Sequence, residues 1–370
     1  MGIFIEDYNV SGADTVALED SIMQKGKQVT AGSKILDNFV SPFNATVVDR
    51  LLDGGFKISG RTVMDEFGLL KLSHDDNNTP SGAVRAVSEG ISAYALCNDL
   101  FGRYREEAPQ YDCCYIHPTY GTVSRYGLIP LASSLDQIGI VCRDLSQGFG
   151  LLSHLAGKDP KDGAMFPDSK YCYGKTDEKI TLGIPRSVIE KADADTRESI
   201  MDFINKFSST DIDLEYFDLY SQVMYILSSA EISNNLSRYD GIKFGYRASG
   251  YTDIDDLYTK TRSEGFGLDA KLTAIMGAVV LSKDHYGPYY EKAMKIRRLI
   301  KESINFDTYD VIVLPCKISD DPYENLALYS LAPLAGLPSV SFSYKGYGIQ
   351  LVAGVKKENL LLSTWEVSMA

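Results

Sequence analysis

Residues 117–139, HPTYGTVSRYGLIPLASSLDQIG, form the stretch from which the rest of the chain is interpreted. The stretch is dense in glycine, proline and serine. Its prolines fix the backbone angle φ, and its glycines can adopt conformations closed to other residues. Rigid connectors of this kind are typical of the border of a functional site, because loops held by a scaffold tend to carry function.

Outside this stretch, segments with the character of strands alternate with amphipathic segments. The expected strands are residues 56–59, 138–142, 180–184, 309–315, 340–343 and 349–353. The expected helices are residues 45–53 (capped by Asn44), 83–96, 195–207, 214–232, 268–281 and 288–304. Strands separated by helices indicate an α/β sheet protein. We expect residues 1–370 to form a single domain, since no repeat, low-complexity tract or linker interrupts them.

Composition excludes several classes of protein. With 44% hydrophobic and 24% charged residues, the chain has an ordinary globular composition, and its net charge is −13. An acidic chain is repelled by phosphate, so direct nucleic-acid binding and anionic-membrane binding are not expected. No run approaches the roughly 18 apolar residues that span a bilayer. A secretory signal pattern is also absent, and the six cysteines lack disulfide-framework spacing, which together predict reduced thiols in the cytoplasm.

Generic site motifs give little indication of a function. GFGLDA, residues 265–270, fits a permissive dinucleotide pattern, but TRSE precedes it where a buried strand should stand. Cys113, Cys114 and His117 could suggest zinc. However, adjacent cysteines rarely bind one ion and no second pair follows, so buried thiols are favoured. The basic run within residues 292–301 is more typical of a solvated helix face than of an RNA-binding patch. We expect no metal and no cofactor.

The 117–139 stretch closely resembles the signature of the amidase signature family. Further segments resemble blocks of that family in the same order, among them residues 30–51, 60–67, 157–163, 230–247, 261–267 and 334–342. Within the family, the chain is most similar to the A subunits of glutamyl-tRNA(Gln)/aspartyl-tRNA(Asn) amidotransferases. The resemblance implies a large mixed central β-sheet covered by helices on both faces. The N-terminal region and the C-terminal tail are shortened relative to the family.

The family hydrolyses amides with a Ser–cis-Ser–Lys triad, in which a neutral lysine accepts a proton, one serine relays it and the other attacks the amide carbon. Carried over by motif, the lysine position in VALEDS is Glu19 and the cis-Ser position in NNTPSGA is Thr79. The nucleophile position in DLFGRYREE is Arg103, whose guanidinium stays protonated and cannot attack a carbonyl. Its neighbours Asp99, Gly102 and Arg105 match the family.

The family's glutamine-carboxylate contact corresponds to Arg262 in TRSEGFG, whereas its acidic partner is replaced near Leu326. With all three triad positions substituted, the resemblance implies an inactive homologue with a binding or scaffolding role. Glu19 and Arg103, which carry opposite charges, are predicted to form an ion pair that fills the former catalytic pocket.

The alternative is an active amidase or glutaminase that supplies ammonia for tRNA-dependent amidation through a relocated nucleophile. The candidates for that nucleophile are Cys113, Cys114, Ser81 and Thr79. By analogy with the family, the expected partners are a B-subunit-like protein and a small amide or glutamine-like ligand.

Overall fold

The computed structural model describes residues 2–71 and 80–369, and within these ranges it forms an 11-stranded mixed β-sheet. The strand order is β1-β3-β2-β4-β6-β5-β10-β11-β9-β7-β8. The strands are β1 (Phe4–Asp7), β2 (Thr15–Glu19), β3 (Lys57–Thr62), β4 (Tyr94–Asn98), β5 (Cys114–His117), β6 (Ile138–Cys142), β7 (Thr181–Ile184), β8 (Ser208–Asp211), β9 (Val311–Pro315), β10 (Ser339–Tyr344) and β11 (Tyr347–Ala353).

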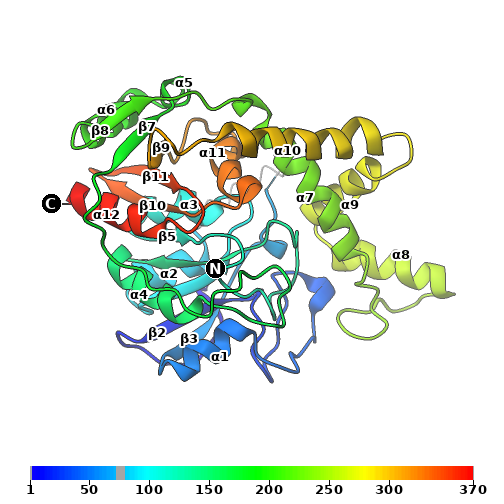
Figure 1. The fold of residues 1–370 in the computed structure, drawn as a ribbon. Helices are drawn as coiled ribbons and strands as arrows, with labels where there is room; N and C mark the ends of the chain where they lie inside the picture. The colour runs from blue at the N-terminus through cyan, green and yellow to red at the C-terminus, as the bar shows by residue number, and fades with distance from the viewer. Residues whose placement is uncertain (1, 72–79, 370) are drawn as a thin grey trace.

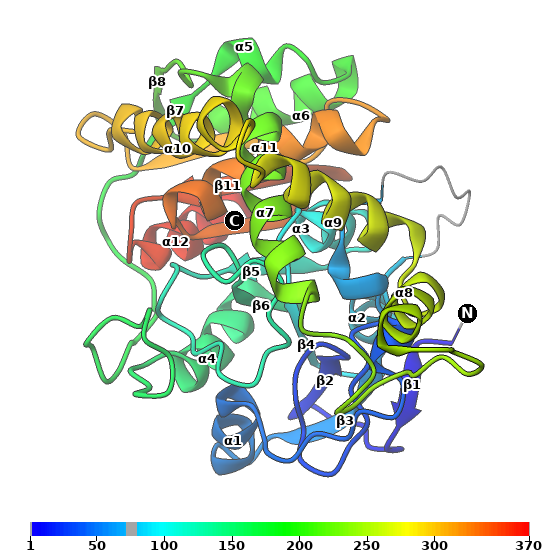
Figure 2. The ribbon, with the colours of Figure 1, turned by 90° about the vertical axis from the view of Figure 1, so that its right-hand side faces the viewer.

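Helices cover both faces of this sheet (Figures 1 and 2). They are α1 (Thr46–Asp53), α2 (Gly82–Ser88), α3 (Arg103–Gln110), α4 (Leu145–Leu155), α5 (Arg186–Ile189), α6 (Ala194–Ile204), α7 (Tyr220–Leu236), α8 (Ile254–Gly265), α9 (Leu268–Val280), α10 (Lys292–Ser303), α11 (Pro322–Ala335) and α12 (Glu358–Met369). Short 3-10 segments lie at Lys34–Leu36, Glu66–Gly68 and Phe217–Leu219, and a π-helical turn at Tyr286–Glu291 precedes α10.

Alternate side chains along a strand pack into hydrophobic cores on opposite faces of the sheet. Val16 and Leu18 of β2 join a cluster with α1, α4, α6 and α12, whereas Ala17 joins one with α2 and α3. In β9, Ile312 and Leu314 face a third cluster formed with α7, α9, α10 and α11. Strands buried on both faces explain the nearly continuous apolar runs in the sequence. The predicted architecture, a large mixed sheet covered by helices, is confirmed.

Several element boundaries differ from the sequence-based predictions. The helix predicted over residues 83–96 ends at Ser88, and β4 begins at Tyr94. Alanine and leucine suit either structure, and burial between β2 and β6 decides for a strand here. The helix predicted over residues 214–232 begins only at Tyr220, because Tyr216 takes a left-handed conformation with φ 63°.

The predicted cap of the first helix was also wrong in detail. The residue at the N-cap of α1 is Ala45, which makes no side-chain cap. The Asn44 amide bonds instead to the Lys25 N–H, at 2.7 Å, and to the Asp49 carboxylate, at 2.8 Å. Among the described residues, no helix is both long and apolar enough to cross a bilayer.

Candidate functional site around Glu19

Glu19 is the last residue of β2, and its carboxylate is completely buried. Three donors surround it. Ser21 Oγ lies 2.5 Å and the Asn98 backbone nitrogen 2.9 Å from Oε2, and the Tyr104 hydroxyl donates to Oε1. Burial nevertheless dominates and raises the pKa of Glu19 to about 7. The residue predicted to occupy the lysine position of the family's triad is thus a buried carboxyl group with three hydrogen-bond donors.

Tyr104, the second residue of α3, contacts the Glu19 carboxyl group. Its ring is buried and stacks on Tyr115 of β5, with centroids 6.1 Å apart. Desolvation, followed by the charge of Glu19, raises the pKa of the Tyr104 hydroxyl well above its usual value. The phenol therefore remains a hydrogen-bond donor to Glu19 at neutral pH, and its ring fills the adjacent space.

Arg103 begins α3 directly after Gly102, which has φ 90°. A Cβ at Gly102 would lie 2.1 Å from the Tyr329 ring, so the close approach of α11 requires glycine there. The Arg103 guanidinium is partly exposed and pairs with Asp65, and its Nε lies 2.9 Å from Glu107 Oε1. Arg103 is thus directed to acidic groups outside the buried pocket.

The two acidic partners of Arg103 also hold the residues that flank segment 72–79. Lys71 Nζ lies 2.9 Å from Asp65 Oδ1, and the Ser81 N–H donates to Glu107 Oε2 at 3.0 Å. An ionic network therefore ties the start of α3 to both sides of that segment.

The predicted Glu19–Arg103 ion pair is wrong. Glu19 accepts hydrogen bonds from Ser21, Asn98 and Tyr104, and within the described ranges Arg103 pairs with Asp65 and Glu107. The side chains of Arg103, Asp65 and Glu107 are partly exposed, so Arg103 retains more hydration there than it would buried beside Glu19, where desolvating both members of a pair is costly. The Tyr104 hydroxyl, in place of the predicted arginine, contacts the Glu19 carboxyl group.

Asp99 and Arg105, the motif residues on either side of Arg103, contact each other directly. Asp99 and Arg105 form a fully buried ion pair, with Arg105 Nε 2.9 Å from Asp99 Oδ2. The Arg105 N–H donates to the same oxygen at 3.1 Å, and Nη1 donates to the Tyr329 carbonyl at 2.7 Å. The first turn of α3 is thereby fixed to β4 and α11.

Residues 117–139, which the sequence predicted to border a functional site, contact the group around Glu19 through Asn98. The buried Asp136 carboxylate accepts from Asn98 Nδ2 at 3.0 Å and from the Leu131 N–H at 2.9 Å. Asn98 Oδ1 accepts from the Gln137 N–H at 2.9 Å. Since Asn98 also donates its backbone N–H to Glu19, one residue connects the stretch to the carboxyl site.

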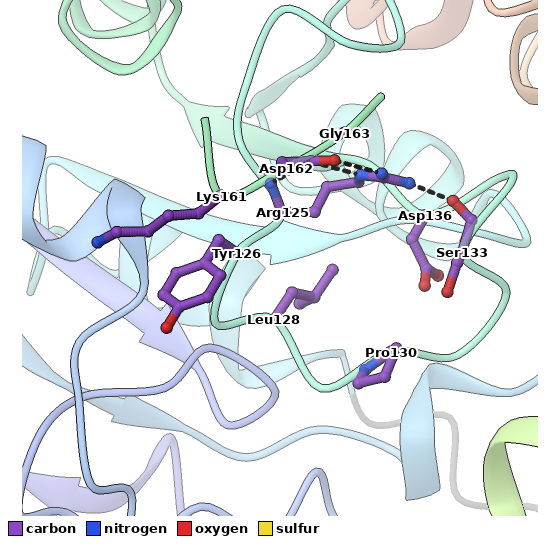
Figure 3. Close-up of a pocket in the computed structure, with 9 residues that line it drawn as sticks. All are labelled: Arg125, Tyr126, Leu128, Pro130, Ser133, Asp136, Lys161, Asp162 and Gly163. Atoms are coloured by element: carbon purple, nitrogen blue, oxygen red, sulfur yellow. Dashed lines mark hydrogen bonds and ion pairs between the residues drawn. The ribbon is translucent and has the colours of Figure 1, made fainter. Parts of the chain in front are cut away.

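A cavity of about 170 Å³ opens beside the same stretch (Figure 3). Asp136 and Ser133 lie on one side of it, and Lys161 and Tyr126 lie on the other. Arg125 Nη2 lies 2.7 Å from Asp162 Oδ1. Burial opposes ionisation of Asp162, but the hydrogen bonds from Arg125 outweigh it and hold the pKa of Asp162 at about 2.

The proposed alternative nucleophiles are poorly placed. Cys113 and Cys114 are buried, and burial raises the pKa of Cys113 to about 11 and that of Cys114 further. Ser81 caps α2, with Oγ accepting the Val84 N–H at 3.3 Å. Thr79, the candidate at the cis-Ser position, lies outside the described residues.

Arg262 lies in α8, where its Nη1 donates to the carbonyls of Leu236 and Tyr239 at 2.9 and 3.1 Å. Its guanidinium stacks over the Phe266 ring, 4.9 Å from the centroid. Among the residues that the structure describes, none of these contacts belongs to the group around Glu19. Leu326, at the place of the family's acidic partner, is fully buried in α11.

Sequence reasoning located Glu19 and Arg103 but missed the residues that hold them. These are Ser21, Asp65, Asn98, Tyr104 and Glu107. Proximity along the chain was the available signal, since Tyr104 follows Arg103 and Ser21 is two residues after Glu19. Within the described ranges, no group of three His, Cys, Asp or Glu side chains could hold a metal ion.

Comparison with known proteins identifies the family of the chain. The Amidase family model matches residues 15–79 and 80–325. The A subunit of glutamyl-tRNA(Gln) amidotransferase from Lachnoclostridium phytofermentans is 36% identical over 365 residues, covering 88% of this chain and 74% of that protein. The corresponding protein of Coxiella burnetii is 35% identical over 380 residues, covering 92% and 78%.

Solved structures share the fold. The A subunit of the Thermotoga maritima glutamyl-tRNA(Gln) amidotransferase superposes with a TM-score of 0.75 at 24% identity, covering 98% of this chain and 86% of that one. A 6-aminohexanoate cyclic dimer hydrolase gives 0.76 at 16% identity, covering 96% and 84%. The chain belongs to the amidase family and resembles the amidotransferase A subunits within it.

Proposed function

We propose that this chain is an amidase-family protein that does not hydrolyse amides and acts by binding a partner or ligand. The observation that carries the proposal is the buried Glu19 carboxyl, which is sealed by Tyr104. The family's mechanism needs a base that receives a proton from a serine in contact with substrate. Both hydroxyls that contact Glu19, those of Ser21 and Tyr104, are buried and cannot meet a substrate carbonyl.

Arg103 supports the same conclusion from the nucleophile side. A guanidinium has no lone pair available for attack, and this one is engaged by Asp65 and Glu107. The alternative of a relocated nucleophile gains no support from Cys113 or Cys114, since burial disfavours their thiolate forms.

The test is ammonia release from glutamine, asparagine and simple amides by the purified chain, with an active amidase as the positive control. We expect no turnover above the protein-free background. Saturable turnover that is abolished by Ser81→Ala, Thr79→Ala, Cys113→Ser or Cys114→Ser would contradict the proposal and establish the relocated-nucleophile alternative.

The relatives are named as subunits of an amidotransferase, which supports a protein partner for this chain. We propose a B-subunit-like partner, which is tested by co-expressing such a protein with this chain and measuring the mass of the complex. Recovery of a complex of defined stoichiometry supports this part. Separate elution of the two proteins at all accessible concentrations would contradict it.

For a ligand, we propose a small amide or glutamine-like molecule whose carboxylate is bound by Arg262. The partly buried guanidinium of Arg262 supports a role in binding an anion, although it already donates to two carbonyls. Calorimetric titration with glutamine, compared between the wild-type chain and Arg262→Lys, tests the assignment. Equal affinity in both would refute the role of Arg262.

We also propose a cytoplasmic location and a single domain over residues 1–370. The cysteines of the described ranges are free thiols, which suits a reducing compartment. The continuous sheet supports one folding unit.

A further inference from the structure

Helix α9 is apolar on both its inner and its outer face. Its inner face packs closely on α7, where a Cβ at Gly277 would lie 2.0 Å from the Ser229 carbonyl and Ser233 Oγ donates to the Ala274 carbonyl at 2.9 Å. Its outer face carries four exposed residues, here called the α9 stripe: Leu268 (59% exposed), Leu272 (40%), Ile275 (61%) and Val279 (44%).

Such a stripe is unusual on a free surface. A helix that is hydrophobic all round is normally buried, and contiguous exposed apolar patches mark interaction sites. The stripe residues are spaced at intervals of four, three and four along the helix, which aligns them on one face. The stripe therefore has the geometry of one half of a helix–helix interface.

The charges on either side of α9 have opposite signs. Figures 1 and 2 show α9 running between α8 and α10 on the outside of the molecule. Exposed acids, Asp253 and Asp255, stand at the start of α8. The exposed charges of α10 are mainly basic: Lys292, Lys295, Arg298 and Lys301 outnumber Glu291 at its N-cap and Glu302, which pairs with Arg298.

We propose that the α9 stripe is a self-complementary surface on which a second copy of this chain docks. The intervals of the stripe read the same in both directions, so two stripes related by a two-fold axis face one another with Leu268 opposite Val279 and Leu272 opposite Ile275. This antiparallel arrangement brings the acidic α8 of each copy towards the basic α10 of the other. A parallel arrangement would place like charges together.

The composition of the surface also favours this occupant. A standard interface buries about 800 Å² on each partner, with an apolar centre and a polar rim. The α9 stripe supplies the centre, and the exposed rings of Tyr286 and Tyr289 extend it at one end. The rim is formed by the charged residues of α8 and α10. An anionic membrane is a poorer occupant, because α8 and the net charge of −13 would be repelled by it.

Sedimentation equilibrium of the full chain tests the proposal. We expect a wild-type dimer at micromolar concentration and a dimer at least about tenfold weaker in Ile275→Glu, because a charge is buried at the centre of the contact. Leu52→Glu, at a residue 50% exposed on α1, is the matched control and should dimerise like the wild type. A monomeric wild-type chain, or equal dimerisation by Ile275→Glu, would overturn the proposal.

A charge exchange provides a second test that leaves the stripe intact. Lys295→Glu and Asp255→Lys should each weaken dimerisation of the chain that carries them. An equimolar mixture of the two variants should dimerise more tightly than either alone, because each mixed pair then has complementary charges at both ends. A mixture no tighter than its components would overturn the antiparallel arrangement. Far-ultraviolet circular dichroism checks that every variant is folded.

Discussion

Replacement of Glu19 by glutamine should make the protein more stable at neutral and alkaline pH. In the folded state, burial raises the pKa of Glu19 to about 7, against 4.5 for an unperturbed glutamate. A raised pKa means that the fold favours the protonated form. The stabilising contribution of that preference is complete below pH 4.5 and is lost as the pH rises through about 7.

The magnitude follows from the difference between these pKa values. A shift of one unit corresponds to about 1.4 kcal/mol, so the ionised Glu19 costs the fold about 3 kcal/mol at pH 8. Glutamine mimics the protonated acid. Its amide oxygen can accept from Ser21 and from the Asn98 N–H, while its NH₂ donates to the Tyr104 oxygen.

The assay is urea unfolding of the wild type and Glu19→Gln at several pH values between 4.5 and 8. We expect the difference in free energy of unfolding to be near zero at pH 4.5 and to rise to about 3 kcal/mol in favour of the variant at pH 8. Titration of other groups cancels in this difference. Glu89→Gln, at an exposed residue paired with Arg85, is the control and should give a nearly constant difference.

A difference between wild type and Glu19→Gln that does not change with pH would refute the reasoning. It would mean that the hydrogen bonds around Glu19 fully compensate the loss of hydration. A variant that becomes less stable as the pH rises would show that the carboxylate is the form preferred by the fold.

Three further predictions concern the anchors. Arg105→Met leaves the buried Asp99 carboxylate without its ion pair and should lower the free energy of unfolding by about 3–5 kcal/mol in urea unfolding. Gly102→Ala should lower the melting temperature because of its positive φ and the crowding of its Cβ, whereas Gly150→Ala, with open space in α4, should raise it slightly. Burial lowers the pKa of His117 well below 6.5, so stability should fall as the pH drops below 6.5, and urea unfolding of His117→Gln should show a smaller fall.

Sequence reasoning predicted the strands whose apolar runs have clear ends. The strand expected at residues 138–142 is observed as β6 over the same residues, and that expected at 309–315 is β9 with two residues fewer. By contrast, β2 is as long as β6 but was missed, because its last residue is the acidic Glu19 and a second acid, Asp20, follows it. Its identity as a strand depends on pairing with β3 and β4, which no local pattern records.

The candidate site was predictable in position but not in its contacts. The VALEDS segment assigned Glu19 to the lysine position, and the register of residues 117–139 assigned Arg103 to the nucleophile position. In the structure the two residues lie at the end of β2 and the start of α3. The charge signs of these two residues suggested an ion pair. The sequence did not reveal that Asp65 and Glu107 are available to Arg103, because their proximity is a product of the tertiary fold.

The start of α3 explains how these two substitutions are accommodated together. Consecutive residues on a helix point in directions about 100° apart, so Arg103 and Tyr104 cannot face the same environment. Arg103 faces Asp65 and Glu107. Tyr104 therefore points towards the interior, where its hydroxyl donates to Glu19. A carboxylate at the end of β2 needs donors where a lysine would need acceptors, and Ser21, Asn98 and Tyr104 supply them. These three donors offset part of the cost of burying the carboxyl group, and the scaffold around Glu19 is retained.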